Sequence, residues 1–87
     1  MALRFVGIDP NTGKDQSPTV WVDEDQGDVI VQTYLADQEL IDQVLAAGHG
    51  PDHDNNIPAH EAVFRIPAHM WPILRKACDA AERAQLL

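Results

Sequence analysis

The chain has 87 residues, of which 45% are hydrophobic and 23% charged, and its formal net charge is −8. This size provides one modest hydrophobic core, so we expect a single domain over residues 1–87. The negative charge argues against direct binding to a nucleic-acid backbone, which needs a positive surface, and favours a basic protein partner.

The remaining global features predict a cytoplasmic protein. The start of the chain, MALRFVGID, lacks the apolar run of a secretory signal, and no stretch approaches the ~20 apolar residues that span a bilayer. The single Cys78 cannot form an internal disulfide and suits a reducing compartment. We expect its thiol to be buried, because free cysteine is among the most buried residue types.

Three strands are predicted in the first part of the chain, near residues 3–8, 19–22 and 29–34. Their sequences are LRFVGI, TVWV and VIVQTY, which combine apolar alternation with β-branched and aromatic residues. Turn-forming residues at 9–13 (DPNTG) and 25–28 (DQGD) separate them. Turns this short predict antiparallel hairpins.

A helix is predicted from Gln38 to Ala47. Asp37 precedes it as the N-cap and Gly48 ends it. An apolar stripe runs along one side of this helix, formed by Leu40, Ile41, Val44 and Leu45. The segment GHGPDHDNNIP at residues 48–58 then reads as a loop.

A fourth strand, near residues 62–66, and a second helix complete the chain. The helix begins between Pro67 and Pro72 and ends near Gln85, since proline is tolerated in a first helical turn. We expect its buried face to consist of Met70, Leu74, Ala77, Cys78 and Ala81. The order β-β-β-α-β-α predicts an α+β fold: a four-stranded, mainly antiparallel sheet with two helices packed on one face.

The apolar residues of the strands point to both sides of this sheet, which is the main functional signal in the sequence. We expect the helices to cover the side that carries Val6, Ile8, Val20, Val22 and Val63. The other side would then present three aromatic residues, Phe5, Trp21 and Phe64. Aromatic residues are enriched in interface cores, so this side is predicted to bind a protein.

A metal-dependent function is the alternative. The segment GIDP at residues 7–10 resembles the opening of the RNase H-like superfamily, in which the aspartate that ends the first strand binds Mg²⁺; here that residue is Asp9. The resemblance ends at the fourth strand, which closes as FRIP without an acid, whereas a two-metal site needs several carboxylates. Asp9 also fits a turn residue that hydrogen-bonds its own backbone. His49 and His53 in the loop are further candidate ligands.

Most of the chain resembles a family of small, uncharacterised actinobacterial proteins. The resemblance rests on FVGIDPNTG, SPTVWVDEDQGDVIVQ and HEAVFRIPAHMWPILRKACDAAE, which are similar to a family pattern of the form GIDP, VWVDE and RLPARM. His69 stands where those proteins have arginine. Their genes often neighbour those of helix-turn-helix regulators. The resemblance implies an accessory to a transcriptional regulator and brings no catalytic residues.

These observations predict a non-enzymatic, acidic interaction protein without a cofactor. It would self-associate as a homodimer, bind a basic DNA-binding regulator, or do both. The predicted partner-binding residues are Phe5, Trp21, Phe64, Asp23, Glu24 and Asp25.

Overall fold

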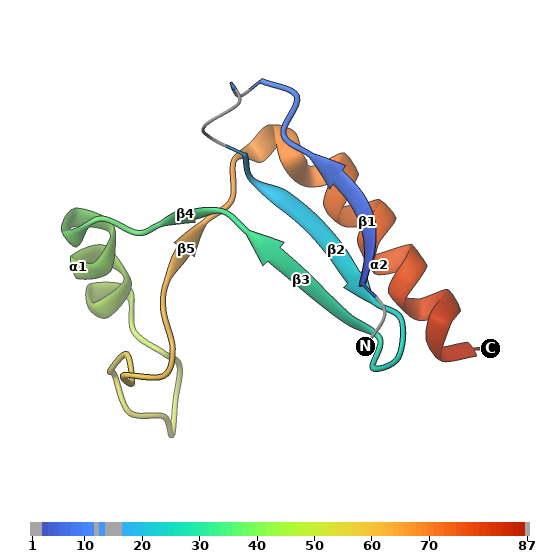
Figure 1. The fold of residues 1–87 in the computed structure, drawn as a ribbon. Helices are drawn as coiled ribbons and strands as arrows, with labels where there is room; N and C mark the ends of the chain where they lie inside the picture. The colour runs from blue at the N-terminus through green and yellow to red at the C-terminus, as the bar shows by residue number, and fades with distance from the viewer. Residues whose placement is uncertain (1–2, 12, 14–16, 87) are drawn as a thin grey trace. The chain divides into compact units, whose positions relative to one another are not determined.

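The computed structural model of the chain describes residues 3–11, 13 and 17–86. They form two compact units, the first from residues 1–33 and 66–87 and the second from residues 34–65. In chain order, the elements are β1 (Leu3–Ile8), β2 (Thr19–Asp23), β3 (Asp28–Gln32), β4 (Tyr34–Leu35), α1 (Gln38–Ala47), β5 (Phe64–Arg65), the 3₁₀ helix η1 (Ala68–Met70) and α2 (Trp71–Leu86) (Figure 1). The fold class is therefore α+β, as predicted.

The first unit contains a three-stranded antiparallel sheet, here sheet A, in the order β1-β2-β3. The β2–β3 hairpin closes at the pair Asp23–Asp28. The Asp23 carboxylate accepts hydrogen bonds from the backbone amides of Asp25 (3.0 Å) and Gln26 (3.3 Å). Gly27 adopts φ 76°, a conformation that glycine reaches without steric cost. The predicted antiparallel hairpin is confirmed.

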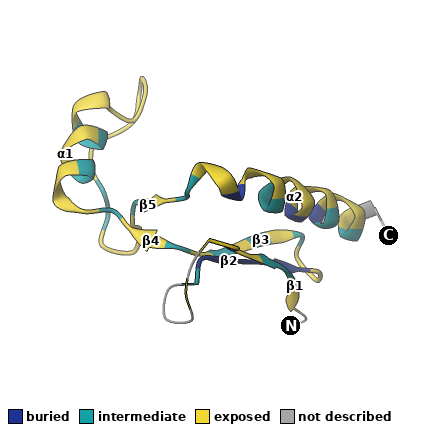
Figure 2. Cartoon of the chain, turned by 90° about the horizontal axis from the view of Figure 1, so that it is seen from above, coloured by how far each residue is buried: buried dark blue, intermediate teal, exposed yellow. Residues whose placement is uncertain are grey.

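Helix α2 covers one face of sheet A (Figure 2). Val20 and Val22 of β2 are completely buried there, together with Met70 and Ala77. The helix lies close to β1, because a Cβ placed on Gly7 would be only 2.9 Å from Cγ2 of Ile73. Small residues on the sheet-facing side of α2, such as Ala77, permit this close packing. The core of the unit therefore lies between α2 and sheet A.

Strand β1 contains a bulge that reverses one predicted orientation. Phe5 pairs with Trp21 and Gly7 with Val20, so Val6 is the extra residue in the ladder. Beyond the bulge Ile8 pairs with Thr19, and its side chain is 46% exposed. The prediction that Ile8 faces the helix was therefore wrong, whereas Val6, Val20 and Val22 do pack in the core.

The second unit holds β4, β5 and α1. Strand β4 pairs with β5 through Tyr34–Arg65 and Leu35–Phe64. The predicted bounds of α1 are confirmed, with Asp37 accepting a hydrogen bond from the Leu40 amide (2.9 Å) and Gly48 following at φ 87°.

The expected four-stranded sheet with both helices on one face requires correction. The fourth predicted strand pairs with Tyr34–Leu35 in a separate two-stranded sheet, and α1 belongs to the second unit. The third strand ends at Gln32 because the chain changes pairing partner after that residue. Helix α2 packs against sheet A.

Helix α2 begins within the predicted interval, but its buried face is rotated slightly from the expected one. Met70, Ala77 and Ala81 are buried, and Leu74 is partly buried. Cys78 is exposed, so the prediction of a buried thiol was wrong. The core side of the helix also includes Ile73 and Ala80, and this rotation carries Cys78 out of the contact with the sheet.

Candidate docking surface

The face of sheet A opposite α2 is apolar and exposed. Alternation along the strands places Phe5, Trp21 and Ile30 in one row across the three strands, with Trp21 paired to both neighbours. Phe5 is 58% and Ile30 38% exposed, and Trp21 is half-buried between them. We define the open face as these three residues and the two further apolar residues of β1 on the same side: Leu3, Phe5, Ile8, Trp21 and Ile30.

The size of the open face is that of an interface core. Four of its five side chains are more than one-third exposed. Together they present an area on the order of a few hundred Å², which is comparable to the largest apolar patch of a typical monomer. In Figure 2 the described part of the first unit places its helix on the other side of the sheet. The open face is therefore the part of this unit best suited to contact another apolar surface.

One end of the open face is acidic. The β2–β3 turn, residues 23–28, carries four carboxylates, and three of them, on Glu24, Asp25 and Asp28, are exposed. Asp28 lies opposite Asp23 at the end of the ladder, on the same side of the sheet as Ile30. Asp23 itself is buried and accepts the turn amides. Of the three predicted acidic contact residues, Glu24 and Asp25 are thus exposed, and Asp23 stabilises the turn.

A buried carboxylate joins the end of β1 to the start of the C-terminal helices. Asp9 is 3% exposed, and its Oδ1 lies 2.7 Å from Nε2 of His69. The same oxygen accepts the Asn11 amide at 2.8 Å, while the Asp9 amide donates to the Pro18 carbonyl. The predicted role of Asp9 as a turn residue is confirmed, and its pairing with a histidine sixty positions away is an additional finding.

The environment of Asp9 lowers the pKa of its carboxyl group. Burial by itself raises this pKa, because it disfavours the charged form. The hydrogen bond from the Asn11 amide, the hydrogen bond from His69 and the charge of His69 act in the opposite direction and together outweigh burial. Asp9 is therefore held as a carboxylate that links two parts of the first unit.

The two candidate metal ligands of the loop, His49 and His53, form hydrogen bonds within that loop. Nδ1 of His49 lies 2.7 Å from Oδ1 of Asn55, and Nδ1 of His53 lies 3.0 Å from the Pro51 carbonyl. Within residues 3–11, 13 and 17–86, no group of three or more His, Cys, Asp or Glu side chains is arranged to hold a metal ion. Asp9 and His69 supply two such side chains, and no third one joins them among the described residues.

The predicted aromatic contact residues belong to different units. Phe5 and Trp21 lie on the open face, whereas Phe64 lies in β5 of the second unit, opposite Leu35. Phe64 is 51% exposed. The open face also contains two residues that the sequence did not assign to it. Ile30 lies on the open face because it pairs with Trp21, and a prediction that also assigned the residue pairs of the β2–β3 hairpin would have included it. Ile8 lies there because of the bulge in β1, and no signal in the sequence predicts that bulge.

Comparison with known proteins adds no relative, because no family model, curated protein or solved structure matches the chain. The resemblance to the actinobacterial family therefore stays a prediction. In the part of the chain that the structure describes, no helix combines the length and apolar character required to cross a bilayer.

Proposed function

We propose that this protein is a non-enzymatic protein-binding module that accepts an amphipathic helix, apolar on one side and basic on the other, on its open face. The observation that carries the proposal is the row Phe5–Trp21–Ile30, which crosses all three strands on the face opposite α2, with its two outer residues exposed and Trp21 half-buried. Aromatic and large aliphatic residues at the centre of a patch are typical of binding hot spots.

The width of sheet A supports a helix as the occupant. Three strands spaced about 4.8 Å apart span roughly 10 Å between the outer strands. An α-helix with its side chains is about 10–12 Å in diameter, so one helix matches this width. The chain's own α2 already packs on the opposite face in this manner. A partner helix would complete a three-layer arrangement and remove the apolar side chains from water.

The charge distribution supports a basic partner over a second copy of the chain. The acidic turn with Glu24, Asp25 and Asp28 borders the open face, and the whole chain carries a net charge of −8. Lysine or arginine residues beside the apolar stripe of a partner helix would meet these carboxylates, whereas two like-charged copies repel each other. DNA-binding regulators, the partner class implied by the sequence resemblance, carry basic helices of this kind.

Fluorescence anisotropy tests the proposal with a labelled model peptide. The probe is a helical peptide of about five turns with leucine on one side and lysine on the other, and the control peptide has glutamate in place of lysine. We expect the lysine peptide to bind in a saturable and salt-sensitive manner, and the glutamate peptide to bind at least tenfold more weakly.

Variants locate the binding site. The double substitution Phe5→Ser with Ile30→Thr removes exposed side chains from the open face and is expected to weaken peptide binding about tenfold. Trp71→Ser is the matched control, because Trp71 is a 47% exposed aromatic residue on α2. Equal loss of binding in the control, or unchanged binding in the double variant, would contradict the proposal.

A further inference from the structure

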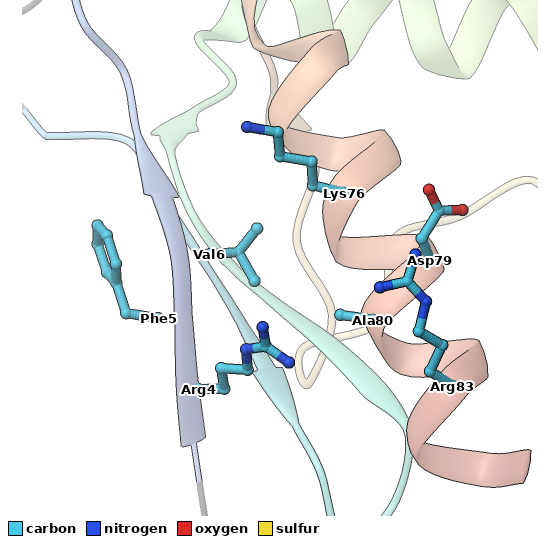
Figure 3. A pocket seen from close by; sticks show the side chains of 7 residues that line it. All are labelled: Arg4, Phe5, Val6, Lys76, Asp79, Ala80 and Arg83. Carbon is cyan, nitrogen blue, oxygen red and sulfur yellow. The ribbon is translucent and has the colours of Figure 1, made fainter.

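A groove between β1 and α2 collects half of the basic side chains of this acidic protein. Its volume is about 250 Å³, and Figure 3 shows its lining. Arg4 reaches from β1 toward the helix, and Lys76 reaches from α2 toward the strand. Arg83 is the third cation, so three of the six Lys and Arg residues of the chain line this groove. Val6 and Ala80 provide apolar walls between them.

The three cations form no close ion pair within the described part of the chain. No ion pair within 4.0 Å joins Arg4, Lys76 or Arg83 to a carboxylate of the described residues. Asp79 is the only acidic residue that lines the groove within the described part of the chain. Three positive charges and one negative charge leave the lining with a net charge of +2. On a chain with a net charge of −8, this concentration of positive charge favours an anionic ligand.

The bulge in β1 argues against a peptide strand as the occupant. β1 is an edge strand, and an acidic peptide could in principle extend the sheet there. However, the bulge interrupts the ladder at Val6, which is one of the groove residues. A bulged edge resists the addition of a regular strand. A compact anion meets no such obstacle, because it needs side-chain donors rather than a continuous backbone ladder.

We infer that this groove binds the phosphate group of a small phosphomonoester. Such a group carries a charge of about −1.5 to −2 at neutral pH, which matches the net charge of the lining. Arg4 and Arg83 can each donate two hydrogen bonds to phosphate oxygens, and Lys76 adds a compact positive charge. The remaining volume of the groove accommodates the organic part of the ligand, and the Asp79 carboxylate can accept a hydrogen bond from a hydroxyl group on it.

The test is a titration of the ¹⁵N-labelled full chain with phenyl phosphate at constant ionic strength, followed by NMR. We expect saturable shifts at the amides of Val6 and Ala80, with a dissociation constant of about 1 mM or lower. Phenol is the neutral control and should leave these amides unchanged. Absence of saturable shifts, or equal shifts with phenol, would overturn the inference.

Three variants separate a specific groove from general electrostatic attraction. Arg83→Gln removes a groove cation and is expected to weaken binding about tenfold. Arg75→Gln removes the same charge from the same helix outside the groove lining, and binding should stay within about twofold. Asp79→Asn should tighten binding several-fold, because it removes the only negative charge of the described lining. Equal weakening by Arg83→Gln and Arg75→Gln would overturn the assignment of the groove.

Inorganic phosphate distinguishes the two sources of the phosphate group. Tighter binding of phenyl phosphate than of inorganic phosphate would support a phosphomonoester ligand. Equal affinities would overturn the organic part of the inference and assign the groove to free phosphate. Phe5, which belongs to the open face, also lines the groove, so the amide of Ala80 on α2 is the signal that reports on the groove apart from the open face. None of the three variants removes an open-face side chain.

Discussion

The two faces of sheet A are both apolar, but one is buried and the other is exposed. On one face Val20 and Val22 are completely buried under α2, and on the other Phe5 and Ile30 remain exposed. The larger, aromatic side chains are on the exposed face, although burying them would stabilise the fold more than burying valines. Burial of these exposed side chains by a partner would therefore release the most free energy, which is the physical basis of the proposed docking surface.

The largest expected effect is on the covered face. Met70 is completely buried in the core between sheet A and the start of α2. Met70→Ala should lower the free energy of unfolding by about 3 kcal/mol, because it removes buried apolar volume and leaves a cavity. Urea denaturation followed by circular dichroism measures this loss. A loss below that of a typical surface substitution would mean that α2 does not pack on sheet A as described.

The closeness of α2 to β1 gives the next effect. Gly7→Ala should lower the free energy of unfolding by about 2 kcal/mol, because the new methyl group would lie 2.9 Å from Cγ2 of Ile73. The second substitution Ile73→Ala should recover part of this loss by making space for the methyl group. If the double variant is less stable than the sum of both single variants, the described contact is wrong.

Asp9→Asn should produce a smaller, pH-dependent loss. The pKa of Asp9 in the folded protein lies below the 3.8 of an ordinary aspartate. The carboxylate therefore contributes stability that is fully present above pH 3.8 and is lost as the pH falls through the lower folded-state pKa. The difference in unfolding midpoint between wild type and variant should shrink as the pH falls below 3.8. A difference that grows in this range would contradict the linkage.

The smallest stability effect is expected on the open face. Phe5→Ser should change the free energy of unfolding by no more than about 0.5 kcal/mol, because the Phe5 side chain is already mostly in water. The losses in the free energy of unfolding of this variant and of Met70→Ala, measured in the same denaturation assay, then compare the two faces of the sheet directly. A loss as large as that of Met70→Ala would show that the open face is covered within the protein.

Local signals in the sequence predicted the local structure. Asp37 and Gly48 marked both ends of α1, and the turn residues at 25–28 marked the β2–β3 hairpin. These features depend on backbone groups only a few residues away, so the identity of a residue determines them. The assignment of Phe5 and Trp21 to the same face of the sheet was also right, because the two residues pair directly between β1 and β2.

Features that depend on distant residues were not predicted. The bulge at Val6 changed the side of Ile8, and the fourth strand pairs with Tyr34–Leu35, so Phe64 belongs to the second unit. The pairing of Asp9 with His69 joins positions sixty residues apart. Periodicity predicted that one side of α2 is apolar, but it did not predict which residues of that side face the sheet, and Cys78 is exposed. Each of these results follows from competing long-range contacts, for which a single sequence carries no direct signal.

The most direct measurement of the central claim uses the two tryptophans of the chain as NMR reporters. Trp21 lies on the open face and Trp71 at the start of α2, so their indole N–H signals report two different exposed surfaces. On titration with the leucine-lysine helical peptide, the account predicts a saturable shift of the Trp21 indole and an unchanged Trp71 indole. A shift of Trp71 alone would contradict it. A Trp21 shift that follows protein concentration without peptide would also contradict it, because the occupant of the open face would then be a second copy of the chain.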